Sequence, residues 1–257
     1  MQERHKNRKI YFDELARTSE KYFLPYVRAW HGIGPGVKVL EIGCGDGGNL
    51  LPFARLGCDV IGVDIAANKI DGARTFFAEA GAEATFIADD IFNIRELEKS
   101  FDIIICHDVF EHIQDKETFL ANLADYLRPE GMVFMAFPAW QMPFGGHQQI
   151  CRSKFLSHLP FYHLLPVCLY KPMLKAFGES SDRVDELLSI KECGLSIERF
   201  ERLVKASELT VADRKLWFIN PHYETKFGLK PRRLASFMSA IPYLRDFFST
   251  SCFYVLR

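Results

Sequence analysis

The segment from residue 41 to residue 47, Glu-Ile-Gly-Cys-Gly-Asp-Gly, joins an apolar run to an expected helix. Its glycines allow positive φ angles and close backbone approach, so main-chain N–H groups at the start of the helix can face a ligand. Asp64 ends the next apolar run, 17 residues after Gly47. A carboxylate at the tip of that strand can accept hydrogen bonds from both hydroxyls of a ribose. Asp89 or Asp90, at the tip of a third run, could meet an adenine amino group.

Two cofactor classes fit this loop, because Gly43, Gly45 and Gly48 also satisfy the fingerprint of dinucleotide-binding proteins. Glu41, two residues before the first glycine, separates the two classes. A carboxylate at the end of the strand repels a pyrophosphate and attracts a cofactor with a cationic amino-acid tail. The charge of the surrounding segment also favours a cationic tail, since residues 32–136 carry 8 basic and 18 acidic residues in a chain whose net charge is −1. An NAD-dependent oxidoreductase is the alternative interpretation.

A regular alternation of apolar runs and helices positions these residues. After a first helix at 11–30, strands are expected at 37–42, 59–63, 84–88, 101–106 and 132–137, with helices through 50–55, at 67–79 and at 116–127. Short, nearly continuous apolar strands alternating with helices predict a parallel sheet that is covered on both faces. Further along, the pattern predicts helices at 182–192 and 196–207, a sixth strand at 209–219 and a seventh at 251–256 on the sheet edge.

The fold class expected from this order is α/β, with a Rossmann-like, doubly wound sheet of seven strands and helical lid insertions. Residues 1–257 are expected to form a single domain with a cofactor-binding core at 32–137. The segments 1–31, 139–180 and 220–250 are expected to form the lid on the substrate side. Of the 35 aromatic residues, 25 lie outside 32–136.

Four motifs follow one another in a fixed order: Glu41-x-Gly-x-Gly-x-Gly47, Gly62-Val-Asp64, Asp102-Ile-Ile-Ile-Cys-His-Asp-Val-Phe-Glu-His112 and Leu127-Arg-Pro-Glu-Gly131. They resemble the successive motifs of class I S-adenosylmethionine-dependent methyltransferases, most closely the branch that includes the ubiquinone and menaquinone biosynthesis enzymes. The resemblance covers residues 37–137 and is weak over 139–250. It implies a sheet whose last strand is antiparallel, S-adenosylmethionine as cofactor and S-adenosylhomocysteine as product.

The resemblance also implies which residues bind the cofactor. The 41–47 loop would hold the methionine moiety and Asp64 the ribose, while residues after the fourth strand would close over the methyl donor. The implied set is Glu41, Gly43, Cys44, Gly45, Gly47, Asp64, Ile65, Asp89, Asp90 and His107.

Histidines are the candidates for catalysis. Methyl transfer from a sulfonium is an in-line displacement, so placing the reactants and excluding water supply much of the rate. An oxygen acceptor also needs a base, for which histidine fits best. His147, which follows the fifth strand after two glycines, and His112 are the catalytic candidates; His222 and Tyr223, after the sixth strand, are substrate-side candidates. A structural role in its own loop is the alternative for each.

No metal is expected. Asp108 and Glu111 share a helix face and His112 is adjacent, but no further ligand has a characteristic spacing. A solvated or capping pair explains the two acids equally well.

The flanking segments bear on the acceptor and on other partners. Residues 138–178 contain no Asp or Glu, and residues 226–245 contain five basic residues. Their aromatic side chains could simply pack a core or lid. They could also form an apolar, cationic entrance for a small or lipid-like acceptor, or contact an anionic membrane. No nucleic-acid partner is expected, because the pI is about 6.7 and no long basic stripe is present.

Seven cysteines without a Cys-x-x-Cys pair, and a basic N-terminus with no apolar run after it, favour a cytoplasmic location. The function expected from the sequence is transfer of a methyl group to a small-molecule or lipid-like acceptor, with O-methylation slightly favoured by the available histidines. Besides the oxidoreductase, a non-catalytic S-adenosylmethionine-binding protein is the second alternative.

Overall fold

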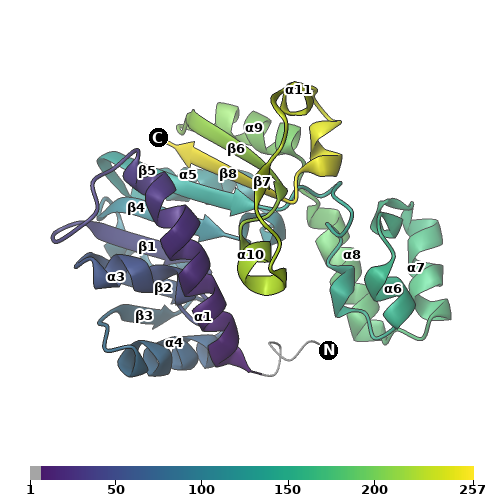
Figure 1. Ribbon diagram of the computed structural model, residues 1–257, viewed down its shortest axis with the longest axis horizontal. Helices are drawn as coiled ribbons and strands as arrows, with labels where there is room; N and C mark the ends of the chain where they lie inside the picture. The colour runs from purple at the N-terminus through teal and green to yellow at the C-terminus, as the bar shows by residue number, and fades with distance from the viewer. Residues whose placement is uncertain (1–6) are drawn as a thin grey trace.

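Eight strands form one sheet in the order β3-β2-β1-β4-β5-β8-β6-β7 in the computed structural model, which describes residues 7–257 (Figure 1). Strands β1 to β5 are parallel to one another, and β8 pairs antiparallel with both β5 and β6. The predicted Rossmann-like sheet with an antiparallel last strand is therefore confirmed. The strands are β1 (Lys38–Ile42), β2 (Asp59–Asp64), β3 (Thr85–Ala88), β4 (Phe101–His107), β5 (Leu127–Phe137), β6 (Val211–Ile219), β7 (Arg232–Arg233) and β8 (Ser251–Leu256).

The helices connect and cover these strands. They are α1 (Arg8–Thr18), α2 (Leu24–Arg28), α3 (Leu51–Arg55), α4 (Ala67–Glu79), α5 (Lys116–Tyr126), α6 (Lys154–His158), α7 (Val167–Ala176), α8 (Ser181–Cys193), α9 (Ile197–Ala206), α10 (His222–Phe227) and α11 (Ser236–Ser239). Shorter turns of helix are η2 (Ser19–Phe23), η3 (Gly48–Leu50), η4 (Ile91–Asn93), η5 (Arg95–Leu97), η6 (Phe110–His112), η7 (Gln148–Ile150), η8 (Tyr162–Leu164) and η9 (Arg245–Phe248). Ser196 caps the start of α9, because its hydroxyl accepts the Arg199 N–H at 3.1 Å.

Alternate residues of the central strands feed two separate apolar layers. Leu40 of β1 and Ile104 of β4 face a layer that includes α5 and α9. Val39 and Ile103 face the opposite layer, which includes α1, α2 and α4. Because both faces are covered, these strands are apolar on both sides, which explains the continuous apolar runs in the sequence.

Three details of the sheet differ from the expectation. The seventh strand is not at the edge: 251–256 lies between β5 and β6, and all six residues are buried. A strand that is apolar on both faces needs neighbours on both sides, whereas β6 is only half-buried and lies nearer the edge. An eighth strand of two residues, β7, pairs with β6. The fifth strand begins at Leu127 instead of 132, because Leu127 already pairs with Phe101; the register then shifts, with Glu130 in a left-handed conformation (φ 65°), before Met132 pairs with Ile103.

The segment between β5 and α9 has a small apolar core of its own, formed by α6, α7 and α8. Figure 1 shows these three helices gathered to one side of the sheet. Among the described residues, no helix is long and apolar enough to cross a membrane.

Candidate active site

Glu41 is a buried carboxylate near the end of β1, with 1% of its surface exposed. Asn49 Nδ2 donates a hydrogen bond to Glu41 Oε1 at 2.7 Å, whereas Oε2 has no hydrogen-bond partner among residues 7–257. Burial raises the pKa of Glu41 to about 8 against the opposing effect of the Asn49 hydrogen bond, and the charge of Asp64 raises it further. A buried carboxylate with one oxygen unused is suited to a cationic hydrogen-bond donor.

The glycine loop is pinned between β2 and the end of β4. Val63 O accepts the N–H groups of both Gly43 (2.8 Å) and Cys44 (3.1 Å). Gly43 has φ 67°, and a Cβ there would lie 2.3 Å from Val109 Cγ2. Glycine is therefore required at this position by backbone angle and by space. The buried Cys44 thiol has its pKa raised by desolvation and takes no part as a thiolate.

Asp64 ties the glycine loop to the start of α4. Its Oδ2 accepts the Gly45 N–H at 2.8 Å, and its Oδ1 accepts the Ala66 N–H at 2.8 Å. Each carboxylate oxygen has further acceptor capacity, so both could still receive a ribose hydroxyl. The next residue, Ile65, leaves 78% of its surface exposed at the rim of the loop.

Asp89 and Asp90 follow β3, and the structure gives them different surroundings. Asp90 caps η4, because its side chain accepts the Phe92 N–H at 3.1 Å. Asp89 Oδ1 accepts from Asn93 Nδ2 and from the Asp90 N–H, and these bonds lower its pKa. Both side chains are exposed at the carboxyl edge of the sheet. Both aspartates accept hydrogen bonds through Oδ1, so these contacts do not separate the two candidates for contact with an adenine.

The N-terminal segment, expected as part of a lid on the substrate side, also covers the glycine loop through contacts that the sequence did not indicate. Asp46 is 2% exposed and forms ion pairs with Arg8 of α1 and with Lys69 of α4. A Cβ on Gly48 would lie 2.5 Å from Phe12 O, so α1 rests directly on the loop. Arg8 and Asp46 are 38 residues apart in the sequence, so no local pattern indicates this ion pair.

His107 and Asp108 end β4 beside this loop. The His107 ring is buried and lies 4.9 Å from the Phe23 ring, with Nε2 3.5 Å from Asp108 Oδ2. Asp108 adopts a left-handed backbone (φ 55°) and leaves 45% of its side chain exposed. Desolvation, and next the charge of Asp108, raise the pKa of both Tyr11 and Tyr223. Asp108 therefore lies near one tyrosine of α1 and one of α10. The sequence motif alone does not show that these segments lie near Asp108.

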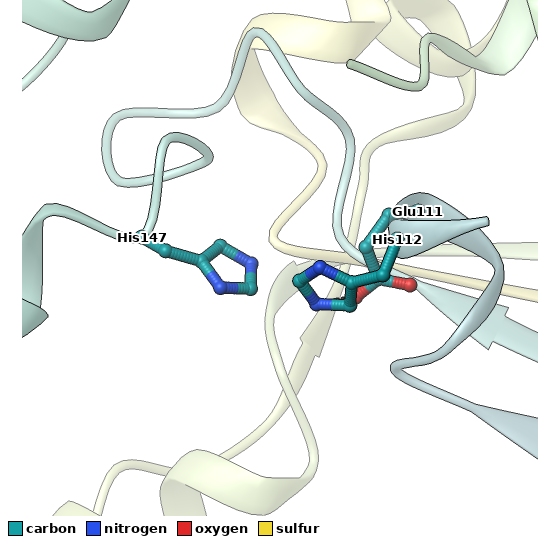
Figure 2. A group of neighbouring side chains, drawn as sticks. All are labelled: Glu111, His112 and His147. Atoms are coloured by element: carbon teal, nitrogen blue, oxygen red, sulfur yellow. Dashed lines mark ion pairs between the residues drawn. The ribbon is translucent and has the colours of Figure 1, made fainter. Parts of the chain in front are cut away.

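The structure brings His112 and His147 together although 35 residues separate them. Figure 2 shows their imidazoles facing each other, with Glu111 behind His112. The ring centroids are 4.9 Å apart at an interplanar angle of 82°, and His112 Nε2 lies 4.0 Å from Glu111 Oε1. His147 has a left-handed backbone (φ 54°), and a Cβ on the preceding Gly146 would lie 2.2 Å from His163 Cβ. The two glycines before His147 thus let its loop pack closely enough to reach His112.

Burial governs the protonation of this cluster. It lowers the pKa of His147 to about 4, with the His112 charge as a further cause, and it also lowers the pKa of His112. Desolvation raises the pKa of Glu111 well above its usual range, and both Glu111 oxygens lack a hydrogen-bond partner among residues 7–257. Both imidazoles are therefore neutral near pH 7. A neutral imidazole oriented by a second polar group is the arrangement of a general base.

Glu111, His112 and His147 are also a set that could hold a divalent metal ion. Each offers one ligand atom, and these atoms lie within 4.8 Å of one another. Nitrogen and oxygen ligands bound at about 2.0–2.2 Å to a tetrahedral ion lie roughly 3.4 Å apart. The three side chains would therefore have to move closer together before all of them could bind one ion.

His222 packs beneath the N-terminal helix. Its Nδ1 lies 3.2 Å from Thr18 Oγ1, its Nε2 lies 4.0 Å from Glu14 Oε2, and its ring meets Tyr11 edge-on at 6.0 Å. With 9% of its surface exposed, His222 holds α10 against α1. Desolvation, and next the charge of Asp108, raise the pKa of the neighbouring Tyr223, which stays a substrate-side candidate.

Comparison with known proteins finds a family match for part of the chain. Residues 39–131, which contain the glycine loop, Asp64 and the Glu111–His112 motif, match the family described as a methyltransferase domain. This segment is thus similar to a methyltransferase domain, in line with the class I resemblance of its motifs. Over 145 residues, 54% of the chain, the sequence is 32% identical to the ubiquinone biosynthesis O-methyltransferase of Bartonella bacilliformis. The match covers 58% of that relative, so the chain spans little more than half the length of the curated relatives it matches.

Solved structures extend the similarity beyond the methyltransferase domain. A putative sarcosine dimethylglycine methyltransferase from Galdieria sulphuraria aligns over 93% of this chain and 84% of its own length, with a TM-score of 0.61 and 16% identity. A plantazolicin methyltransferase, solved with a substrate analogue and S-adenosylhomocysteine, aligns over 99% of this chain and 88% of its own, with a TM-score of 0.59 and 19% identity. At these identities the alignments show a shared fold.

Proposed function

We propose that this protein transfers a methyl group from S-adenosylmethionine to an oxygen atom of a small, lipid-like acceptor and releases S-adenosylhomocysteine. The cofactor would supply an electrophilic methyl group on a sulfonium. The methyltransferase domain, the curated relatives named for ubiquinone biosynthesis, and the fold neighbour solved with S-adenosylhomocysteine support this proposal.

The observation that carries the proposal is the unused oxygen of Glu41. A buried, partnerless carboxylate oxygen beside a glycine loop fits the ammonium of an amino-acid tail. The same carboxylate would repel the pyrophosphate of NAD, and nothing in the comparisons favours an oxidoreductase or a non-catalytic binding protein. Asp64 would hold the ribose, and Asp89 or Asp90 would lie near the adenine.

On the acceptor side, His147 would take the proton of the acceptor hydroxyl. His112 lies against His147 and is placed to orient it. Asp108, Tyr11 and Tyr223 would surround the acceptor, and the helices over the glycine loop would exclude water from the transfer.

The flanking segments 1–31, 139–180 and 220–250 would form the acceptor-side lid of a single domain. Peripheral contact with an anionic membrane is part of this proposal. Phe155 and Phe177 stack at 5.4 Å on the surface with 57% and 44% of their areas exposed, next to the basic helix α7. Apolar rings beside lysines are the groups that insert at an anionic interface.

A cytoplasmic location is supported by the seven cysteines, all of which are free.

Calorimetric titration of S-adenosylmethionine, S-adenosylhomocysteine and NADH into the protein tests the cofactor. Both sulfur cofactors are expected to bind, and NADH is not. Tight binding of NADH without a response to the other two would refute the proposal.

Asp64→Ala is expected to weaken S-adenosylmethionine binding by about 1–3 kcal/mol, because it removes a half-buried carboxylate that accepts hydrogen bonds. The same calorimetry measures this loss, and the exposed Asp71→Asn variant on α4 serves as the matched control. An Asp64→Ala affinity equal to that of the wild type would remove Asp64 from the site.

A chelator distinguishes a base from a metal centre in the Glu111–His112–His147 cluster. Turnover is expected to be unchanged after dialysis against EDTA, because the separated ligand atoms favour a free imidazole. Loss of turnover on dialysis, and its recovery with Zn²⁺ or Mg²⁺, would assign the cluster to a cation instead.

A further inference from the structure

Two carboxyl groups meet between α9 and the chain that enters β8. Asp246 is fully buried, and its Oδ1 accepts the Ile197 N–H at 2.7 Å. Glu198 Oε1 accepts the Tyr243 N–H at 2.8 Å and a hydrogen bond from Arg245 Nε at 3.1 Å. These bonds leave one oxygen on each acid, Asp246 Oδ2 and Glu198 Oε2, buried and without a hydrogen-bond partner in the described chain.

The charges around this pair do not balance. Besides Asp246 and Glu198, the network contains Glu201, which accepts from Arg245 Nη2 at 3.0 Å and from Arg214 Nη1 at 2.7 Å. Three carboxylates thus meet two guanidinium groups. An unmatched negative charge in a buried setting is costly, and a proton shared by two adjacent carboxyl groups removes it.

On the side that faces the sheet, the groups near Asp246 and Glu198 are neutral. The Tyr254 hydroxyl of β8 donates to Glu201 Oε1 at 2.9 Å, and the Cys252 thiol lies buried beside it. Burial raises the pKa of both groups well above their usual values, so neither supplies a charge.

We infer that Asp246 and Glu198 share one proton, and that this proton latches residues 241–250 onto α9. The latched segment connects α11 to β8, exposes the apolar side chains of Tyr243 and Leu244, and reaches the 138–178 segment through the Phe161–Phe247 ring contact at 6.3 Å. Without the proton, two carboxylates face each other in the interior and repel the segment from α9. The inference does not depend on methyl transfer.

The pH range over which the shared proton holds residues 241–250 on α9 follows from the pKa values of the two acids. Burial and the neighbouring Glu198 raise the pKa of Asp246 to about 7, whereas hydrogen bonds lower the pKa of Glu198 although burial opposes them. In the open segment both acids regain ordinary values near 4. The closed state therefore binds the proton more tightly, and its advantage is lost as the pH rises from about 4 to about 7, by up to tenfold per pH unit.

Hydrogen exchange of the full chain, read by mass spectrometry from pH 5 to pH 8 and corrected for intrinsic rates, tests the latch. Protection of residues 241–250 is expected to fall with rising pH up to about 7 and then to level off. Asp246→Asn keeps a donor toward Glu198 but cannot titrate, so its protection is expected to be independent of pH. Glu224→Gln, an acid on α10 outside the pair, is expected to keep the wild-type profile.

Infrared spectroscopy of the wild-type protein is the second measurement, because it does not require a variant to fold. Because Glu41 and Glu111 also stay neutral at pH 6, the expected signal is the loss of one carboxylic-acid carbonyl centred near pH 7, ahead of the loss from Glu41 near pH 8. A flat exchange profile in the wild type, a wild-type slope in Asp246→Asn, or carbonyl absorbance that does not fall around pH 7 would each overturn the inference.

Discussion

S-adenosylmethionine is expected to bind this protein more tightly at pH 7.5 than at pH 6, by about tenfold or more. In the free protein, burial raises the pKa of Glu41 to about 8, so the side chain carries a proton below that pH. An ammonium group at Glu41 Oε2 favours the carboxylate, and binding must therefore release the proton. Affinity rises by up to tenfold per pH unit until Glu41 is ionised near pH 8, and it falls at higher pH as the α-amino group of the cofactor loses its own proton near 7.7–8.0.

Calorimetry in two buffers of different ionisation enthalpy measures both the affinity and the protons released. Close to one proton per bound cofactor is expected at pH 6.5. Glu41→Gln should weaken binding by about 1.5–3 kcal/mol at pH 7.5, the range for hydrogen bonds to charged groups, and should release no proton. If Glu41→Gln kept the wild-type pH dependence, the proton would come from another group and the ammonium contact would be wrong.

The sequence predicts the central sheet well because its strands are apolar on both faces. Runs such as residues 101–106 are typical of a covered parallel sheet, so the positions of these strands along the chain follow from the apolar pattern. The position of β8 could not be predicted in this way. Its place between β5 and β6 depends on long-range pairing, such as that of Phe134 with Val255, which no local pattern encodes.

The proposed cofactor side and the proposed acceptor side of the site also differ in how far apart their residues lie in the sequence. The cofactor side is local: Glu41, Gly43 and Asp64 lie at strand ends, and their spacing fixes their positions. The acceptor side is assembled from distant segments, as the pairing of His112 with His147 shows. Asp108 illustrates the limit, because its neighbours from α1 and α10 become visible only when the chain is folded.

His147→Ala is expected to lower turnover by on the order of 10²–10⁴-fold, the contribution typical of a general base. Since burial lowers the pKa of His147 to about 4, the imidazole is neutral and able to accept a proton at any pH near neutrality. The side chain is not expected to contact the cofactor, so S-adenosylmethionine affinity should be unchanged. Formation of S-adenosylhomocysteine with a hydroxylated aromatic acceptor that carries a short isoprenoid tail measures the turnover.

Two further variants separate the base from its support. His158→Ala, an exposed histidine at the end of α6, should retain wild-type turnover and controls for the loss of an imidazole in the same flanking segment. His112→Ala should lower turnover less than His147→Ala, because it removes the neighbour that orients the base and leaves the base itself. Equal losses in the two cluster variants would mean that the histidines act as one unit, and full turnover in His147→Ala would show that the acceptor loses its proton to another group or directly to water.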